Sequence, residues 1–323
     1  MSIAVIGQGF VGGSLTTVMS ERGERVFVYD KAMKRAEGGI SSFSRGESET
    51  VTPQSIEEFV SECENVSDFK GIFFVCVPTP MEQDGSCDVS IVESVLSEIA
   101  RATENSEIQR RQRIAVVKST VPPGSTQRWN EIFASSSLTV IFSPEFLTEA
   151  NALDDMRNQN RVILGGPRPQ INQVRNVFVR TFPSVPIIKT SSTTAEMVKY
   201  VTNCTLAVKV SLANEFEQIC ESLDNQGLNI DYDKVIEYAK LDSRIGTTHW
   251  AVPGPVPLEN GDHAKGFGGH CFPKDINALI KIAESVGVNP VVMKAAWEKN
   301  LEVRPPSHRD WERQIGRAVS VKK

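Results

Sequence analysis

The sequence predicts an α/β fold in which a doubly wound parallel sheet is followed by a mainly helical domain. Over about the first 190 residues, short apolar runs alternate with segments of helical spacing, a pattern that favours parallel strands joined by right-handed crossovers. The first apolar run ends in a cluster of glycines. From about 193 to 223 the chain contains neither Pro nor Gly, which predicts one long helix. We therefore expect two domains, 1–190 and 191–323, with the long helix as their connector.

The composition limits what the chain can do. Its 323 residues correspond to about two domains at roughly 150 residues each. A net charge of −5 argues against general nucleic-acid or membrane binding, and no apolar run reaches the ~18 residues of a membrane span. Residues 1–10 show no signal-peptide pattern, so a cytoplasmic protein is expected. The six cysteines form no CxxC pair, so neither a metal site nor a disulfide framework is expected.

Each expected element follows from a local pattern. Strands are expected where apolar runs end at turn residues, over 3–6, 25–30, 71–77, 114–118, 138–142, 161–164 and 185–189. Further helices are expected over 89–100, 231–239, 274–286 and 290–302, whereas 246–269 is rich in Gly and Pro and should be loop. The run 191–196 offers an N-cap for the long helix, with Glu196 placed as in a capping box. Asn289 is the expected N-cap of the last helix, with Pro290 at its first position.

A glycine motif at 7–12 follows the first expected strand and opens a helix. It reads GQGFVG and fits GxGxxG, the fingerprint of a Rossmann-type dinucleotide site. Gly7 would make the tight turn, Gly9 would let the backbone approach a pyrophosphate, and Gly12 would allow close helix packing. The helix N-terminus at Phe10 and Val11 would hold the phosphates.

Asp30 ends the second expected strand and indicates which cofactor is used. It lies 18 residues beyond Gly12, where an acidic side chain accepts a hydrogen bond from the ribose 2′-hydroxyl and repels a 2′-phosphate. NAD is therefore expected rather than NADP. Basic residues nearby, including Lys31 and Arg35, weaken that preference, and Arg35 is itself a candidate cofactor contact.

Two further expected strands end in threonine and proline. Thr79 stands in VPTP at 77–80, and Thr120 stands in KSTVPPG at 118–124. In doubly wound sheets, ligands gather at the carboxyl ends of the strands, so either threonine could reach the cofactor. Turn chemistry alone would also explain both positions.

The segment 266–275, GFGGHCFPKD, places a cysteine where a glycine-rich loop meets a helix. A helix N-terminus lowers a thiol pKa, and Lys274 adds positive charge nearby. Cys271 is therefore a candidate nucleophile, whereas the other five cysteines lie in apolar contexts typical of inert core residues.

At this point the sequence resembles the UDP-glucose/GDP-mannose dehydrogenase family. The resemblance rests on seven motifs in the family's order, spread over nearly the whole chain: GQGFVG at 7–12, VPTP at 77–80, KSTVPPG at 118–124, SPEFLTEA at 143–150, AEMVKYVTN at 195–203, LANE at 212–215 and GFGGHCFPKD at 266–275. It implies oxidation of a sugar 6-hydroxyl to a carboxylate in two steps, with two NAD+ and a covalent cysteine adduct.

The resemblance assigns roles around Cys271. This thiol would form the thiohemiacetal and then the thioester. Lys199 and Asn203, one helical turn apart, would form an oxyanion hole for the oxygen at the reacting carbon. Asp275, one turn beyond Cys271, would position water or share in proton transfer.

The remaining roles lie mainly in the SPEFLTEA motif. Glu145 would act with a water as general base, Glu149, four residues on, would sit near the nicotinamide, and Thr120 would order the water. Arg244 would reach the substrate of a partner subunit. The substrate-binding candidates are Glu145, Phe146, Leu147, Lys199, Asn203, Arg244, Phe267, Gly268 and Gly269.

The sequence also departs from the family pattern. His270 stands where a small residue commonly precedes the cysteine, and it either supports the thiolate or is merely tolerated. The loop 254–265 is longer than the family's usual path. The third, nucleotide-gripping domain is expected to be absent, and the basic residues from Arg304 onward are expected to form a solubilising tail rather than phosphate contacts.

These observations favour a cytoplasmic, NAD-dependent nucleotide-sugar 6-dehydrogenase that forms a homodimer through its long helix. UDP-glucose is the leading substrate, and GDP-mannose or a UDP-N-acetylamino sugar is the alternative within the family. From another class, the chain could be an NAD-binding regulatory module without activity. The ionisable residues named above argue against such a module.

Overall fold

The computed structural model describes residues 2–31, 39–40, 42–44, 47–51, 55–104, 112–258 and 261–321. The chain divides into two compact units. The first comprises Met1–Thr79 and Val89–Lys199, and the second comprises Pro80–Asp88 and Tyr200–Lys323.

The first unit is built on a sheet in the order β10-β9-β8-β7-β6-β1-β2-β4-β5-β3. The seven expected strands are all present as β1 (Ser2–Ile6), β2 (Arg25–Tyr29), β6 (Phe69–Val75), β7 (Arg113–Val117), β8 (Leu138–Phe142), β9 (Val162–Gly165) and β10 (Ile187–Thr190). Three short strands, β3 (Gly39–Ile40), β4 (Ser42–Ser44) and β5 (Glu47–Val51), were not expected. The sheet is mostly parallel, but β9 runs antiparallel to β8 and β4 antiparallel to β2. An apolar run predicts burial equally well for either strand direction, so the sequence pattern could not reveal these reversals.

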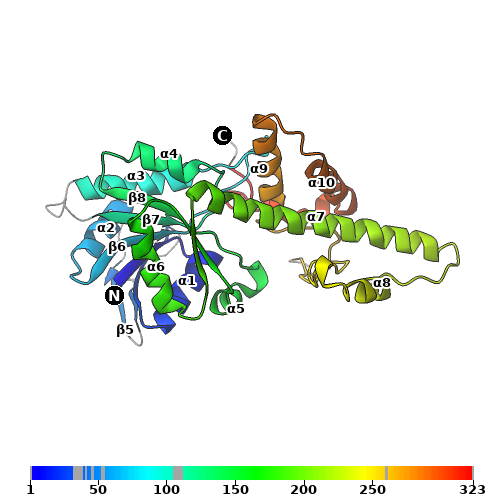
Figure 1. Cartoon of the computed structure of the whole chain (residues 1–323), viewed down its shortest axis with the longest axis horizontal. Coiled ribbons are helices and arrows are strands. Elements are labelled where there is room, and N and C mark those ends of the chain that lie inside the picture. Colours follow the sequence, from blue (N-terminus) through cyan, green and yellow to red (C-terminus); the bar gives the residue numbers. More distant parts are fainter. Residues whose placement is uncertain are drawn as a thin grey trace. The chain divides into compact units, whose positions relative to one another are not determined.

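Helices cover both faces of this sheet (Figure 1). On one face, α2 (Ile56–Glu64), α3 (Ser90–Glu104) and α4 (Ser125–Ile132) share an apolar core with the sheet. On the other, α1 (Phe10–Glu21), α5 (Ala152–Arg157) and α6 (Gln170–Thr181) build a second core. The doubly wound Rossmann-type architecture is thus confirmed, and the strands that precede the motifs are buried between two layers of helices.

The long helix α7 spans Ser192–Asp224, close to the expected 193–223. The capping box expected at its start is wrong in part. Ser191 does cap the helix, since its Oγ accepts from the Thr194 N–H at 3.1 Å. Glu196, however, is fully buried and accepts from the N–H groups of Gly124 (2.6 Å) and Thr126 (2.9 Å) at the start of α4. A carboxylate can cap a neighbouring helix when packing brings that helix close, which local spacing does not reveal.

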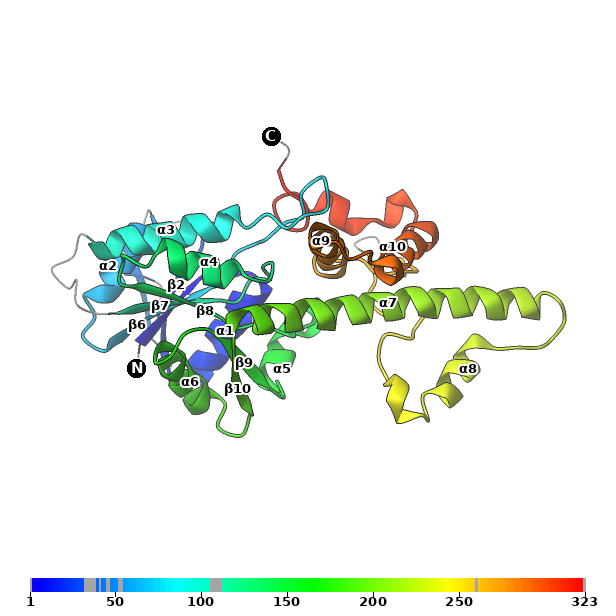
Figure 2. The same cartoon turned by 45° about the horizontal axis from the view of Figure 1, so that its top comes forward.

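The second unit is mainly helical (Figure 2). Besides α7 from Tyr200 onward, it holds α8 (Tyr232–Ala239), α9 (Phe272–Ser285), α10 (Val291–Val303) and the 3₁₀ turns η2 (Ser243–Ile245), η3 (Pro306–His308) and η4 (Asp310–Arg313). Its largest core joins α7, α9 and α10. The residue that caps α10 is Pro290, not Asn289, because the helix begins one residue later than expected.

The residues after α10 do not form a solubilising tail. Arg304 is 5% exposed, and Trp311 is 2% exposed and lies 5.7 Å from the Trp297 ring. The chain then pairs with the 80–88 segment, where Met81 donates to the Ala318 carbonyl at 2.8 Å and accepts from the Ser320 N–H at 2.9 Å. Charge content alone suggested solvation, but these arginines find carbonyl and carboxylate partners within the unit. The last two lysines lie outside the described residues.

Candidate active site

The glycine motif has the geometry of a dinucleotide site. Gly7 adopts φ +91°, and a Cβ there would lie 2.4 Å from the Cys76 carbonyl oxygen. At Gly12, a Cβ would lie 1.8 Å from the Gly7 carbonyl oxygen. Both positions therefore require glycine, as expected of a turn that brings the backbone and the start of α1 close to a pyrophosphate. Gly9 is the N-cap of α1, which begins at Phe10.

This geometry makes a sharp prediction for two adjacent glycines. Gly12→Ala should lower NAD+ affinity at least about tenfold, because the methyl group cannot fit without moving the phosphate-binding turn. The matched control is Gly13→Ala, whose Cβ would meet only the Gln8 carbonyl oxygen at an ordinary 3.5 Å. Calorimetric titration with NAD+ measures both, and equal affinities for the two variants would contradict the assignment.

The other expected cofactor residues flank this turn. Phe10 is 42% exposed, Val11 is half-buried, and both lie in the first turn of α1. Asp30 follows β2, and its Oδ2 accepts from the Gln8 N–H at 2.6 Å, which places the carboxylate against the motif. Thr79 is buried just beyond β6. Arg35 lies outside the described residues.

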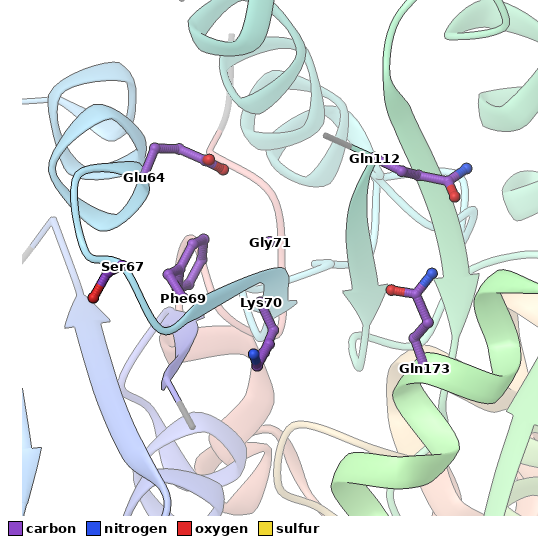
Figure 3. Close-up of a pocket in the computed structure, with 7 residues that line it drawn as sticks. All are labelled: Glu64, Ser67, Phe69, Lys70, Gly71, Gln112 and Gln173. Atoms are coloured by element: carbon purple, nitrogen blue, oxygen red, sulfur yellow. The ribbon is translucent and has the colours of Figure 1, made fainter. Parts of the chain in front are cut away.

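A separate pocket of about 350 Å³ opens at the amino ends of the strands, away from the glycine motif at their carboxyl ends. Figure 3 shows its lining, which comes from the start of β6, the residue before β7, and α2 and α6: Glu64, Ser67, Phe69, Lys70, Gly71, Gln112 and Gln173. Ligands of doubly wound sheets bind at the carboxyl ends of the strands, so this pocket at the amino ends is not the cofactor site.

A buried polar cluster follows β7 and β8 in the first unit. The Lys199 Nζ donates to the Glu145 Oε1 at 2.8 Å and to its backbone carbonyl at 2.7 Å. The second carboxylate oxygen accepts from the Leu147 N–H at 2.7 Å. Lys118, also buried, donates to the Pro144 carbonyl at 3.1 Å and to the Ser143 hydroxyl at 3.3 Å. Lys199 therefore holds both the carboxylate and the backbone carbonyl of Glu145, and Lys118 holds the two residues before it.

Burial and charge act against each other in this cluster. Burial alone would raise the pKa of Glu145, but the ammonium of Lys199 and its hydrogen bond, the Leu147 N–H and Lys118 together lower it. Burial lowers the pKa of Lys118 to about 8, although the negative charge of Glu145 partly offsets this effect. Glu145 is thus ionised at neutral pH, as a general base must be.

The other expected site residues of the first unit lie around the Glu145–Lys199 cluster or away from it. Phe146 lies beneath the Arg161 guanidinium at 3.9 Å, and Thr120 is buried just beyond β7. Glu149 is exposed at the start of the 3₁₀ turn η1 (Glu149–Asn151). Despite their four-residue spacing, Glu145 and Glu149 do not share a helical face, because the chain is not helical between β8 and η1.

The second unit holds a buried group around Asp275. Cys271 is the N-cap of α9, and its carbonyl accepts from the Asp275 N–H at 2.9 Å. The Asp275 Oδ1 accepts from the Lys274 Nζ at 2.5 Å, and its Oδ2 accepts from the Asn203 Nδ2 at 2.6 Å. The loop expected to deliver a cysteine to a helix start is therefore present, with a fixed carboxylate one turn away.

The charges of this group are balanced locally. Burial alone would lower the pKa of Lys274, but the negative charge of Asp275, with smaller effects of Cys87 and Cys271, raises it well above its ordinary value. Burial raises the pKa of the Cys204 thiol strongly, and this sulfur contacts the Asp275 carbonyl at 3.5 Å. Cys204 is therefore a poor nucleophile compared with a cysteine at a helix start.

The remaining candidates lie in loops of the second unit. The Arg244 side chain is 86% exposed and pairs with Asp242 at 2.5 Å. Phe267 is buried, whereas Gly268, Gly269 and His270 are half-buried.

Several residues of these clusters were missed or undervalued from the sequence. Lys118, Glu196, Asn300, Arg304 and Asp310 are buried or half-buried polar groups that hold site loops or helix ends. Lys118 stands in KSTVPPG, so its motif membership was the one available signal. The others are recognisable only from contacts distant in sequence.

A doubly wound sheet with a glycine turn after β1 and an acidic residue after β2 defines a dinucleotide-binding domain of the NAD-binding class. Residues 1–182 match the NAD-binding domain of the UDP-glucose/GDP-mannose dehydrogenase family, and residues 193–302 match its central domain. The chain belongs to the UDP-glucose/GDP-mannose dehydrogenase family.

Known relatives support this membership. A UDP-glucose 6-dehydrogenase of Bacillus subtilis is 31% identical over 94% of this chain and 63% of its own length. The UDP-glucose dehydrogenase structure from Pyrobaculum islandicum superposes with a TM-score of 0.74 at 28% identity, over 93% of this chain and 67% of that one. A UDP-D-ManNAc dehydrogenase from Pyrococcus horikoshii, 22% identical with a TM-score of 0.69 over 94% of this chain and 69% of that one, shares the fold. The chain thus spans about two thirds of these relatives. Within the described residues, no helix is long and apolar enough to cross a membrane.

Proposed function

We propose that this protein oxidises the 6-hydroxyl of a nucleotide sugar to a carboxylate, with UDP-glucose as substrate and UDP-glucuronate as product. The observation that carries the proposal is Cys271 at the start of α9, one turn before a carboxylate held by Lys274 and Asn203. The curated relatives named UDP-glucose 6-dehydrogenase favour UDP-glucose over GDP-mannose or a UDP-N-acetylamino sugar. Residues 1–190 would bind NAD, and 191–323 would bind the sugar and dimerise.

The first step converts the alcohol to an aldehyde. When bound, NAD+ accepts a hydride from the reacting carbon, and the hydroxyl proton passes to a base. Gly7, Gly9, Gly12, Phe10 and Val11 would hold the pyrophosphate, and Asp30 the ribose. Lys199 and Asn203 would donate hydrogen bonds to the oxygen at the reacting carbon, which stabilises the charge that develops there.

The second step needs the aldehyde to be retained. The Cys271 thiolate would add to the aldehyde carbon, forming a C–S bond and a thiohemiacetal, whose oxidation with loss of a second hydride gives a thioester. Glu145, aided by Thr120, would take a proton from a water that attacks the thioester carbon. The C–S bond then breaks, releasing the carboxylate and the thiolate. Each sugar thus consumes one water and yields two NADH and three protons.

The same proposal includes a homodimer. The α7 face of the second unit exposes Val201, Leu212, Phe216 and Ile219, each 40–50% accessible, at spacings that place them on one side of the helix. Burying such a stripe against a second copy would stabilise a dimer. Arg244, whose side chain is exposed, would exchange its ion pair with Asp242 for a contact with the partner's substrate. A cytosolic setting would keep the Cys271 thiol reduced.

A panel of nucleotide sugars, each incubated with NAD+ and followed by NADH absorbance, tests the proposal. We expect UDP-glucose to give the highest kcat/KM, two NADH per sugar and no released aldehyde. A higher value with GDP-mannose or a UDP-N-acetylamino sugar would reassign the substrate. No NADH with any sugar would instead favour a regulatory NAD-binding module.

A further inference from the structure

The residues that follow α10 grip the loop that leads to Cys271. We call residues 304–320 the C-terminal segment and residues 266–269 the glycine loop. Arg304 donates through Nη1 to the carbonyls of Lys265 (3.1 Å) and Gly266 (3.4 Å), and through Nε to the His308 carbonyl (2.8 Å). Its Nη2 donates to the Asp310 Oδ1 at 2.8 Å. One guanidinium thereby joins the glycine loop to the C-terminal segment.

Asp310 completes this link from the other side. Its Oδ2 accepts from the Gly269 N–H at 2.8 Å, a charge-assisted hydrogen bond to backbone. Between these contacts, a Cβ on Gly268 would lie 2.3 Å from both the Arg304 Nη2 and the Asp310 Oδ1. The backbone of the glycine loop therefore packs directly against the ion pair, and a side chain at position 268 would displace Arg304 or Asp310.

A second clamp holds the same loop one residue earlier. The fully buried Asn300 of α10 accepts from the Phe267 N–H at 2.7 Å and donates to the Phe267 carbonyl at 3.1 Å. The glycine loop is thus fixed on both sides of Gly268. Such loops gain their geometry from the groups that hold them, since glycine itself restrains little.

The C-terminal segment is itself anchored well beyond Asp310. Trp311 is buried, and the segment's end forms two backbone hydrogen bonds with Met81. Because the C-terminal segment is anchored at both of its ends, it can fix the position of the glycine loop that it contacts. The family's central-domain match ends at residue 302, before this segment begins.

We infer that Asp310, oriented by Arg304, is a positioning residue that sets the place of the Cys271 thiol through the Gly269 amide. Only His270 separates Gly269 from Cys271, so a shift of the glycine loop moves the start of α9. The inference rests on the proposed function, in which Cys271 is the nucleophile. It adds a requirement that lies outside the family's catalytic motifs.

Asp310→Asn tests this role with little change in size. The amide nitrogen would face either Arg304 or the Gly269 N–H, replacing one attractive contact by two opposed donors. We expect kcat to fall roughly 10- to 100-fold with the KM for NAD+ unchanged. We also expect the pH curve of Cys271 alkylation by iodoacetamide, followed by mass spectrometry, to move to higher pH.

Glu312→Gln is the matched control, since Glu312 lies in the same segment and pairs with Arg309 at 3.6 Å on the surface. It should leave kcat and the alkylation curve unchanged. If Asp310→Asn does not fold, Gly268→Ala perturbs the same contact from the loop side and should give the same shift. The inference is overturned if a folded Asp310→Asn protein keeps the wild-type kcat and alkylation curve. If that variant does not fold, the same result for Gly268→Ala overturns it. An equally large effect of Glu312→Gln would overturn it as well. If the wild-type protein were inactive on every sugar, the proposed function would be refuted. The pH curve of Cys271 alkylation would still test the positioning role of Asp310, because alkylation needs no sugar.

Discussion

Cys271→Ser should abolish carboxylate formation, with overall turnover falling by about 10³-fold or more. A serine hydroxyl is far less acidic than a thiol, so it cannot supply the nucleophile that retains the aldehyde. NAD+ affinity should not change, because the glycine motif lies in the first unit and Cys271 in the second. NADH absorbance measures turnover, and calorimetric titration measures cofactor binding.

The control for this prediction is another cysteine of the same unit. Cys220 is buried in α7, away from the Asp275 group, and Cys220→Ser should keep turnover close to that of the unmodified protein. Full activity of the Cys271→Ser variant would refute the covalent mechanism. Loss of NAD+ binding in that variant would show instead that the substitution damages the fold.

Much of the fold could be predicted because its signals are local. Apolar runs located seven strands, and the absence of Pro and Gly located α7 to within one residue at each end. Glycine spacing located the dinucleotide turn, since Gly7 and Gly12 are required by steric contacts with nearby backbone. Strand direction, by contrast, depends on how distant segments pair, so the reversal at β9 left no trace in the pattern.

In the candidate site, too, residues in local motifs could be predicted, whereas residues defined by contacts distant in sequence could not. Motifs located Cys271, Asp275, Lys199 and Glu145, and the structure supplies the partners of each. The role of Glu196 as a cap for α4 depends on contacts that span about seventy residues. Arg304 was expected in a solvated tail because charge usually indicates exposure, and nothing in the sequence pointed to its partner Asp310. From sequence alone, a partly buried ion pair such as Arg304–Asp310 cannot be told from a surface pair.

Lys199→Met should destabilise the protein by about 3–5 kcal/mol at neutral pH, because it leaves the Glu145 carboxylate buried without its principal partner. The two side chains are only 2% and 9% exposed, so solvent cannot replace the lost charge. In the proposed reaction the same change also removes an oxyanion donor, and kcat should fall about 10²- to 10³-fold. Urea denaturation measures the free energy of unfolding.

The pH dependence separates this explanation from simple loss of packing. In the unmodified protein the pKa of Glu145 is lowered, so its contribution to stability is present above about pH 4.5 and is lost as the pH falls through the folded value. Without Lys199, burial would raise that pKa above its ordinary value, so the variant should gain stability on acidification as Glu145 takes up a proton. The difference in unfolding free energy between the two proteins should therefore shrink between about pH 7.5 and pH 5. Arg157→Met, which removes the exposed partner of Glu21, should change the unfolding free energy little at any pH, because solvent screens that pair. A Lys199→Met deficit that stayed constant over the pH range would mean that packing, and not the charge of Glu145, is what Lys199 maintains.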